Sequence, residues 1–262
     1  MFEPEVVEVF VRYGLLVVGG VVAGVINTLA GGGSILLIPI LLASGLPPTV
    51  ANGTLRASIL VQAATSAWTF QRKGVYPKGS TLRLLIPIVL GAAAGSFVAT
   101  RVPDQAMRLV FGVVFVVLGF YLTFGRRKSS DTQAEQQSDL HGGIGTKTMF
   151  GALAVGAYGG LIQAGVGFAM IALLVGSAGF SLIEANAIKV RFVAAYSAIA
   201  LVIFAQAGLV AWREGFAVAV GGLVGGWLGV RLQLKISHTW LQRFVIAAMV
   251  VSGVAMILGT VS

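Results

Sequence analysis

The chain has 262 residues, of which 57% are apolar and only 10% are charged, and its mean hydropathy is +0.93. Disorder is excluded because it requires low hydrophobicity and high charge, and a soluble enzyme is disfavoured because soluble domains carry about 25% charged residues. The absence of cysteine excludes a disulfide scaffold, a thiolate metal site and a cysteine nucleophile. The composition therefore predicts an all-α polytopic membrane protein, whose net charge of +9 lies in loops that set membrane orientation, without a nucleic-acid partner.

Long stretches without a charged residue run through the chain and are separated by short polar turns. Crossing the hydrocarbon core takes roughly 20 apolar residues, and most of the stretches reach that length. Two of them, 13–55 and 148–183, are too long for one helix, and each holds a Gly-rich interruption before a short apolar segment (34–44 and 168–178). We predict eight transmembrane helices plus these two short broken or re-entrant segments, with the helices at 6–28, 53–71, 82–100, 105–124, 148–163, 187–210, 215–234 and 239–260.

The sequence aligns with itself without a gap when it is shifted by 134 positions. Ala30-Gly31-Gly32-Gly33 then falls on Ala164-Gly165-Val166-Gly167, and Ala51-Asn52 falls on Ala185-Asn186. We interpret this as an internal duplication, in which each repeat has four helices and one short segment. Repeat 1 covers 1–124, repeat 2 covers 148–262, and the polar, nonperiodic stretch 125–147 between them is a linker.

The orientation of the two repeats depends on the short segments. If the segments dip into the membrane and return, the halves are parallel; if they cross it, the halves are inverted. The inverted arrangement places more Lys and Arg residues on the linker side and so agrees better with the positive-inside rule. Length argues the other way, because about 12 helical residues rise only ~18 Å. We favour an inverted pseudo-twofold arrangement of the halves, with tilted, broken segments packed inside protein.

The two Gly-rich interruptions are the first candidate site. An interrupted helix leaves backbone groups that need partners within the membrane, and paired interruptions in a duplicated chain are the best sequence pointer to a transporter's binding site. The helix that starts after each break would direct free N–H groups and a positive dipole end at a bound anion. Tight turns between packed helices are the alternative interpretation. The residues concerned are Asn27, Thr28, Gly31, Gly32, Gly33 and Ser34 in the first break and Gln163, Gly165 and Gly167 in the second.

A second group of polar residues follows each short segment, in ANGTLR (51–56) and EANAIKVR (184–191). Asn52 and Asn186 are equivalent under the repeat and could be substrate contacts or helix N-caps. An ionisable residue within a span suggests a functional role, although the basic residues could also extend to the interface. Glu184 could neutralise one of them or carry a proton. The basic residues are Arg56, Lys189 and Arg191, and their charge favours an anionic substrate.

Motifs for catalysis are absent from the sequence. It contains neither HExxH nor GxxxxGK[ST], so a zinc peptidase and an ATP-driven motor are not indicated. His141 and His238 lie far apart in sequence, which disfavours a histidine metal site. We expect no enzymatic activity, no cofactor and no metal.

The sequence resembles the TauE/SafE family of bacterial permeases, the sulfite exporter or TSUP group, over essentially the whole chain outside the linker. The motifs that carry the resemblance are GVINTLAGGGSILLIPILLASGLPPTVANGT (24–54) and GGLIQAGVGFAMIALLVGSAGFSLIEANAIKVR (159–191). The second motif departs from a plain Gly-Gly-Gly form at Val166. The resemblance implies a secondary carrier of sulfur-containing anions such as sulfite, sulfonates or sulfoacetate.

These observations lead to one functional hypothesis and two alternatives. We expect a secondary transporter in the bacterial inner membrane that binds a small organosulfur anion between its halves and works by alternating access. The backbone of both breaks and the polar side chains would contact the anion, and Lys189, Arg191 or Arg56 would balance its charge. The alternatives are an anion channel and a noncatalytic membrane scaffold or sensor. A coupling ion (proton or sodium) and a homo-oligomer fit the transporter, and the lipid bilayer is a necessary partner.

Overall fold

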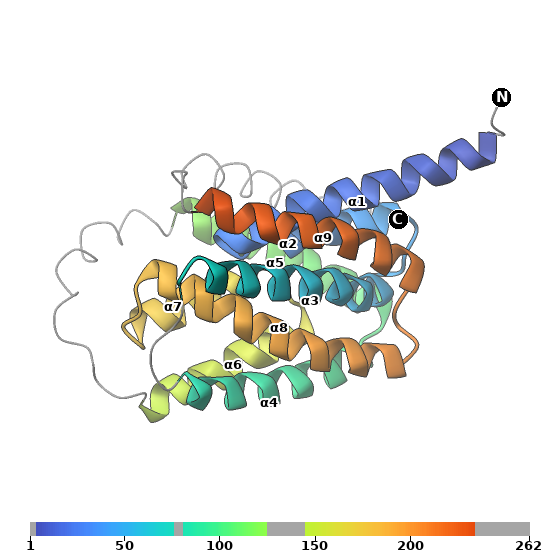
Figure 1. Cartoon of the computed structure of the whole chain (residues 1–262). Coiled ribbons are helices and arrows are strands. Elements are labelled where there is room, and N and C mark those ends of the chain that lie inside the picture. Colours follow the sequence, from blue (N-terminus) through green and yellow to red (C-terminus); the bar gives the residue numbers. More distant parts are fainter. Residues whose placement is uncertain (1–3, 76–80, 125–144, 234–262) are drawn as a thin grey trace.

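The computed structural model describes residues 4–75, 81–124 and 145–233, and within these ranges the chain is helical, without strands. The predicted helix at 239–260 and most of the linker 125–147 lie outside the described residues. Each element found corresponds to a predicted one, and the short second and seventh helices are the two segments that follow the breaks (Figure 1). The elements are α1 (Pro4–Ala30), α2 (Gly33–Ala43), α3 (Pro48–Arg72), α4 (Leu82–Ala99), α5 (Asp104–Phe124), α6 (Thr146–Leu161), α7 (Val166–Gly176), α8 (Leu182–Gln206) and α9 (Trp212–Gln233).

Helices α3 and α8 begin about one turn earlier than predicted. Pro48 starts α3 at the first helical position, where a proline costs nothing because its missing N–H would have no partner in the helix. At α8 the hydroxyl of Ser181 accepts the backbone N–H of Glu184, and the Glu184 carboxylate accepts the N–H of Ser181. This reciprocal capping box fixes the start of α8. The interpretation of Asn52 and Asn186 as N-caps is therefore wrong, because both lie inside their helices.

The surface of the bundle carries large apolar side chains. Phe10 on α1 and Phe216 on α9 are each 73% exposed, and Leu90 on α4 and Phe120 on α5 are also exposed. Such a surface is unusual for a soluble monomer and suits contact with lipid tails. Three of the described helical segments are long and apolar enough to cross a membrane, by length and composition: Glu8–Leu29, Leu182–Gln206 and Trp212–Gln233. The chain is thus a helical membrane protein, and the number of eight spans stays a prediction.

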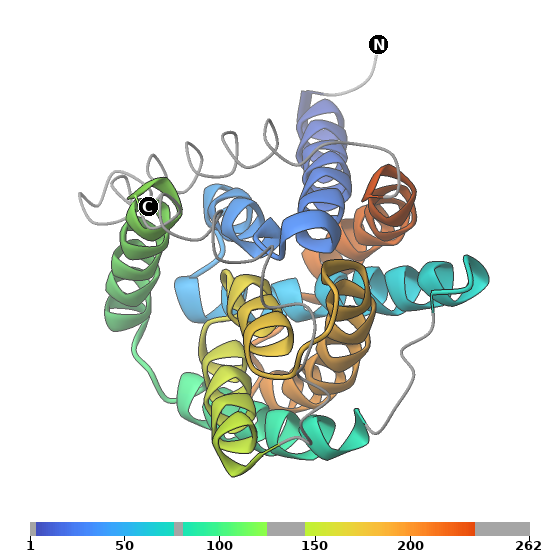
Figure 2. The ribbon, with the colours of Figure 1, turned by 90° about the vertical axis from the view of Figure 1, so that its left-hand side faces the viewer.

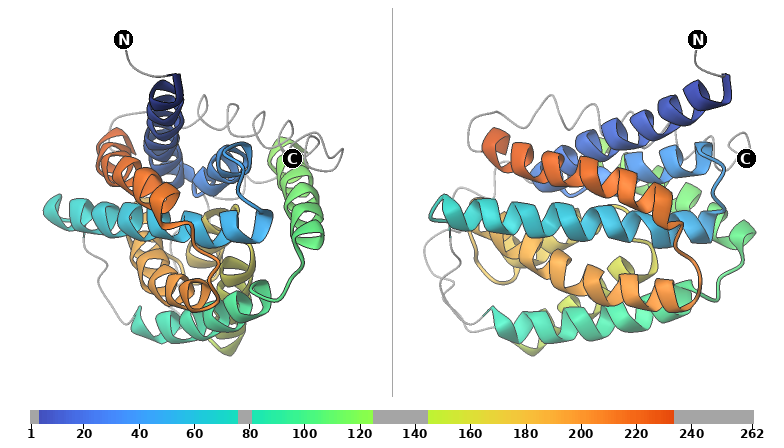
Figure 3. Two further views of the ribbon diagram at one scale, coloured as in Figure 1. Left: turned by 90° about the vertical axis from the view of Figure 1, so that its right-hand side faces the viewer. Right: turned by 45° about the vertical axis from the view of Figure 1, so that its right-hand side comes forward.

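Helix α3 lies in the middle of the bundle, between α1 and α9 on one side and α4, α6 and α8 on the other (Figure 3). It runs parallel to α9, because Ser58 donates to the carbonyl of Val218 and Ser66, two turns later, donates to that of Gly226. Helices α1, α3 and α9 share one direction, and α4, α6 and α8 share the opposite one (Figure 1). Helix α5 stands apart from the others at the edge (Figure 2).

Glycines allow the helices to pack backbone to backbone. A Cβ at Gly20 of α1 would collide with the carbonyl oxygen of Val218 on α9, and one at Gly91 of α4 would collide with that of Leu153 on α6. The most extensive helix contacts are these two, α1 with α9 and α4 with α6. Small residues are typical of close helix crossings in membranes, where van der Waals packing replaces the hydrophobic effect.

The α1–α9 contact predicts that a larger side chain at Gly20 lowers the stability of the protein, whereas one at an exposed position of α1 does not. We expect Gly20→Leu to lower the free energy of unfolding by at least about 2 kcal/mol, because the new side chain meets backbone that cannot move aside. Gly14→Leu is the matched control, since Gly14 is exposed on the same helix and has no atom within 4 Å of its Cβ position. Thermal unfolding of the two variants in detergent checks this. Equal melting temperatures would contradict the contact.

Candidate binding site at two helix breaks

The two breaks meet in the interior of the bundle. Gly31 ends α1 with a φ of +84°, which favours glycine, and Gly167 lies in the first turn of α7. A Cβ at Gly31 would lie 2.5 Å from the Cα of Gly167, so the two backbones are in direct contact. The breaks are 134 residues apart in sequence, and the structure brings them together.

Each break exposes amide groups at the start of a short helix. The first N–H groups of a helix have no acceptor within that helix. Those of Gly33 and Ser34 in α2 and of Gly167 in α7 also donate to no other group in the described ranges. They are available to an acceptor such as an anion, which the positive end of a helix dipole favours.

The second break has a strained residue held by a hydrogen bond. Gln163 is the non-glycine residue with a positive φ, +66°, among those described. Its side chain is buried, and its Oε1 accepts from Nη1 of Arg56 at 2.6 Å, while its carbonyl accepts from the hydroxyl of Ser34 at 3.2 Å. Strained backbone persists where the surroundings over-determine it, and here Arg56 and Ser34 do so from the first half of the chain.

Arg56 is fully buried and braces α3 against the end of α6. Its guanidinium donates to the carbonyls of Gly159 and Gly160, both at 2.7 Å, and to the Oε1 of Gln163. It also donates to the carbonyl and the side-chain oxygen of Asn52 at 3.3 and 3.2 Å. A guanidinium has five N–H donors, and these five contacts use that capacity. Arg56 therefore holds the protein together at the second break.

Lys189 plays the corresponding part at the first break. Its amine donates to the carbonyls of Asn27 and Thr28 at 3.1 and 3.2 Å, and to the Oδ1 of Asn186 at 2.7 Å. The side chain is only 1% exposed. A cation from α8 thus satisfies the end of α1, as the cation from α3 satisfies the end of α6. Each reaches across to the break in the other half of the chain.

The remaining predicted residues have defined partners. Asn52 donates through Nδ2 to the carbonyl of Leu161 at 2.8 Å, next to the second break. Arg191 donates to the carbonyl of Ala187 on its own helix at 3.5 Å. The expectation that Glu184 neutralises a basic residue is wrong, because its carboxylate accepts from Ser181 in the capping box.

Ser58, Gln62 and Ser66 form a polar stripe on α3 beside the first break, and this stripe was not predicted from the sequence. Asn27 donates to the Oε1 of Gln62 at 2.6 Å, and the Nε2 of Gln62 donates to the hydroxyls of Thr28 and Ser66 at 2.7 and 3.0 Å. Ser58 lies one turn before Gln62 on the same stripe. The spacing of four between these residues in α3 was the signal that identifies them, since positions i and i+4 share a helix face.

Some of these residues line a small cavity of about 10 Å³ next to the first break. A volume of this order holds about one water molecule, so the cavity is too small for an organic anion in this conformation. The lining includes polar side chains from α1, α2 and α3: Asn27, Ser34, Ser58 and Gln62.

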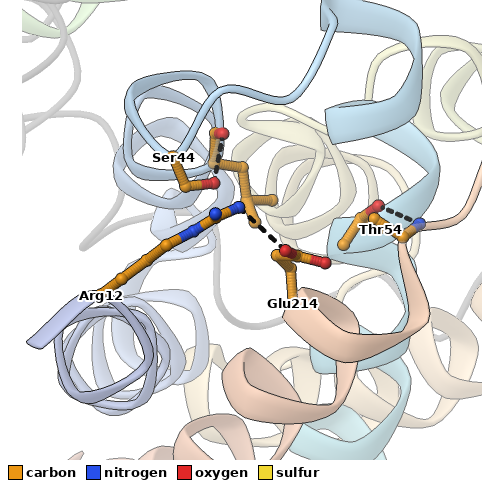
Figure 4. Close-up of polar contacts among 6 residues, drawn as sticks. Arg12, Ser44, Thr54 and Glu214 are labelled. Atoms are coloured by element: carbon orange, nitrogen blue, oxygen red, sulfur yellow. Dashed lines mark hydrogen bonds and ion pairs between the residues drawn. The ribbon is translucent and has the colours of Figure 1, made fainter. Parts of the chain in front are cut away.

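One end of the bundle is tied by contacts to the start of α9 (Figure 4). Arg12 of α1 forms an ion pair with Glu214 at 2.9 Å, and the hydroxyl of Thr54 on α3 accepts the N–H of Ala211 at 2.9 Å. Ser44 lies near them and donates to the carbonyl of Leu41 on α2. The first and third helices are thus both connected to α9 at this end.

Known proteins are similar to this chain over most of its length. The family described as sulfite exporter TauE/SafE matches residues 16–256. A probable membrane transporter protein of Haemophilus influenzae is 27% identical over 87% of each chain, and one of Xylella fastidiosa (strain Temecula1) is 29% identical over 84% of each. The probable membrane transporter protein YfcA of Escherichia coli K12 is 24% identical over 85% of this chain and 81% of its own. No solved structure matches.

The contacts of Arg56 predict a structural role that does not depend on a ligand. We expect Arg56→Leu to lower the free energy of unfolding by about 3 kcal/mol or more, because it leaves the carbonyl of Gly159 and the Oε1 of Gln163 buried without a donor. Arg72→Leu, at the exposed end of the same helix, is the control and should change stability little. Denaturation in detergent without added anions compares the two. Similar stability of both variants would mean that Arg56 does not brace the break.

Proposed function

The chain belongs to the sulfite exporter TauE/SafE family, and we propose that it is a secondary transporter of a small sulfur-containing anion such as sulfite, a sulfonate or sulfoacetate. Its relatives are named as probable membrane transporter proteins, which indicates a transporter and not an enzyme. The anion would bind where the two breaks meet.

The observation that carries this proposal is the sign of the charge at the breaks. Among the described residues the buried charged side chains are Arg56 and Lys189, both cationic, and no carboxylate is buried. The unpartnered amides of Gly33, Ser34 and Gly167 add positive partial charge at the same place. A site with this charge attracts an anion and repels a cation.

We propose further that the chain consists of two inverted repeats, 1–124 and 148–262. The 134-residue shift pairs α1 with α6, α3 with α8 and α4 with α9, and the members of each pair run in opposite directions (Figure 1). The extensive packing of α1 on α9 has its counterpart in the packing of α6 on α4. These relations support a pseudo-twofold axis in the membrane plane, which is typical of transporters that alternate access by rocking one part against another.

Within this mechanism the predicted site residues divide into two groups. Asn27 and Ser34 line the cavity together with Gln62. The breaks would provide backbone donors at Gly32, Gly33, Gly165 and Gly167, whereas the N–H of Gly31 already donates to the carbonyl of Asn27. The others make the contacts that hold the breaks or balance charge, and opening of the site would loosen some of them: Thr28, Asn52, Arg56, Gln163, Asn186, Lys189 and Arg191.

Ligand-dependent melting tests the binding of a sulfur anion. We expect one member of a panel of sulfite, thiosulfate, sulfate, taurine, sulfoacetate and chloride to stabilise the detergent-purified protein by about 2.7 kcal/mol at 100 times its Kd. Gln62→Leu should lose this increase because it removes the amide group of Gln62 from the cavity. Gln71→Leu, at an exposed position of the same helix, should retain it. If no sulfur anion stabilises a well-folded protein, the proposed substrate class is wrong.

Transport in proteoliposomes separates a carrier from a channel. The proposed carrier should show counterflow, in which unlabelled anion inside the vesicle accelerates entry of the labelled anion. A channel would instead pass a steady anion current in planar bilayers without counterflow, and a scaffold or sensor would do neither. A large anion current without counterflow would contradict the carrier and indicate a channel.

A further inference from the structure

The amine of Lys189 lies in a cluster of oxygens at the end of α1. The cluster consists of the carbonyls of Asn27 and Thr28 and the side-chain oxygen of Asn186, at 2.7 to 3.2 Å from Nζ. The last carbonyls of a helix have no partner within the helix and carry its negative dipole end. Carbonyls freed at an interrupted helix are the groups that hold sodium ions in transporters with inverted repeats.

The charge of Lys189 is balanced by oxygens that carry only partial charges. In the described part of the chain the ion pair joins Arg12 to Glu214 near the surface, and no described acidic residue is hydrogen-bonded to Lys189. Among the described residues the Thr28 carbonyl accepts only from this amine, whereas the Asn27 carbonyl also accepts from the N–H of Gly31. The geometry is that of a cation surrounded by neutral oxygen ligands, and here the amine of Lys189 takes the place of a free ion.

We propose that the Lys189 amine is a tethered cation that fills a sodium-type site, so that sodium does not bind there. The consequence for transport, which rests on the proposed function, is that anion movement does not require sodium. A tethered cation cannot dissociate on either side of the membrane. While the amine holds its proton, its positive charge stays beside the first break, where it attracts the anion from both sides.

Substitution of the amine tests the oxygen cluster without any substrate. Lys189→Ser removes the amine and leaves the three oxygens with room for an ion, whereas Lys189→Met removes the charge but keeps an apolar side chain of similar length. The measurement is the melting temperature of the detergent-purified full chain in sodium chloride and in choline chloride at equal concentration. Wild type and Lys189→Met should melt equally in both salts. For Lys189→Ser, sodium at ten times its Kd should raise the melting temperature by about 2–5 °C.

Two results would overturn the proposal. The first is a folded Lys189→Ser variant that melts equally in both salts, because the oxygens would then not form a cation site. The second is a wild-type protein that sodium stabilises relative to choline, because the site would then not be filled by the amine. Lys189→Asn serves as a second, larger replacement if Lys189→Ser does not fold.

Transport by the wild-type protein supplies an independent measurement. Uptake of labelled sulfoacetate into proteoliposomes should be the same when all sodium is replaced by choline, and a sodium gradient should not drive accumulation. Uptake that requires sodium would contradict the tethered cation. Absence of uptake of every sulfur anion would contradict the proposed function, while the melting comparison would still decide whether Lys189 fills a cation site.

Discussion

The contact between Gly31 and Gly167 determines the arrangement of the rest of the bundle. Neither position has room for a Cβ, so the two chain interruptions can approach until their backbones touch. This contact brings the ends of α1 and α6, and the starts of α2 and α7, into the interior. Each of these ends has backbone groups without helical partners, and inside a membrane protein those groups must be satisfied by other parts of the chain.

Two buried cations satisfy the helix ends, and they do so reciprocally. Arg56 of α3 holds the end of α6 and the second break, and Lys189 of α8 holds the end of α1. Burying a charge away from water is costly unless it is well hydrogen-bonded, and the five contacts of Arg56 and three of Lys189 offset that cost. Because each cation belongs to one half of the chain and holds the break of the other, movement of the halves in the proposed carrier would change both breaks together.

The sequence predicted the breaks and the buried cations but not the way they are connected. The Gly-rich interruptions, the short segments and the charges at Arg56 and Lys189 are visible because each is unusual within an apolar stretch. The starts of α3 and α8 were placed too late because Asn52 and Asn186 resemble caps, although Ser181 and Glu184 have the spacing of a capping box. The partners of Arg56 on α6, Gly159 and Gly160, lie more than 100 residues away, and no local pattern encodes them.

The small volume of the cavity places a physical condition on the proposed binding of an anion. Its volume of about 10 Å³ excludes a sulfonate, and Asn27 already donates one of its two amide hydrogens to the Oε1 of Gln62. An ionised sulfonate has acceptors only, so in the proposed carrier a sulfonate that accepts this hydrogen would compete for it with Gln62. Gln62 would then have to move, and with it the contacts that its Nε2 makes to Thr28 and Ser66. Ser66 also contacts Gly226 of α9, so exchange of one acceptor at the cavity would loosen α3 from both α1 and α9. Binding of the anion and separation of these helices are, on this argument, one event.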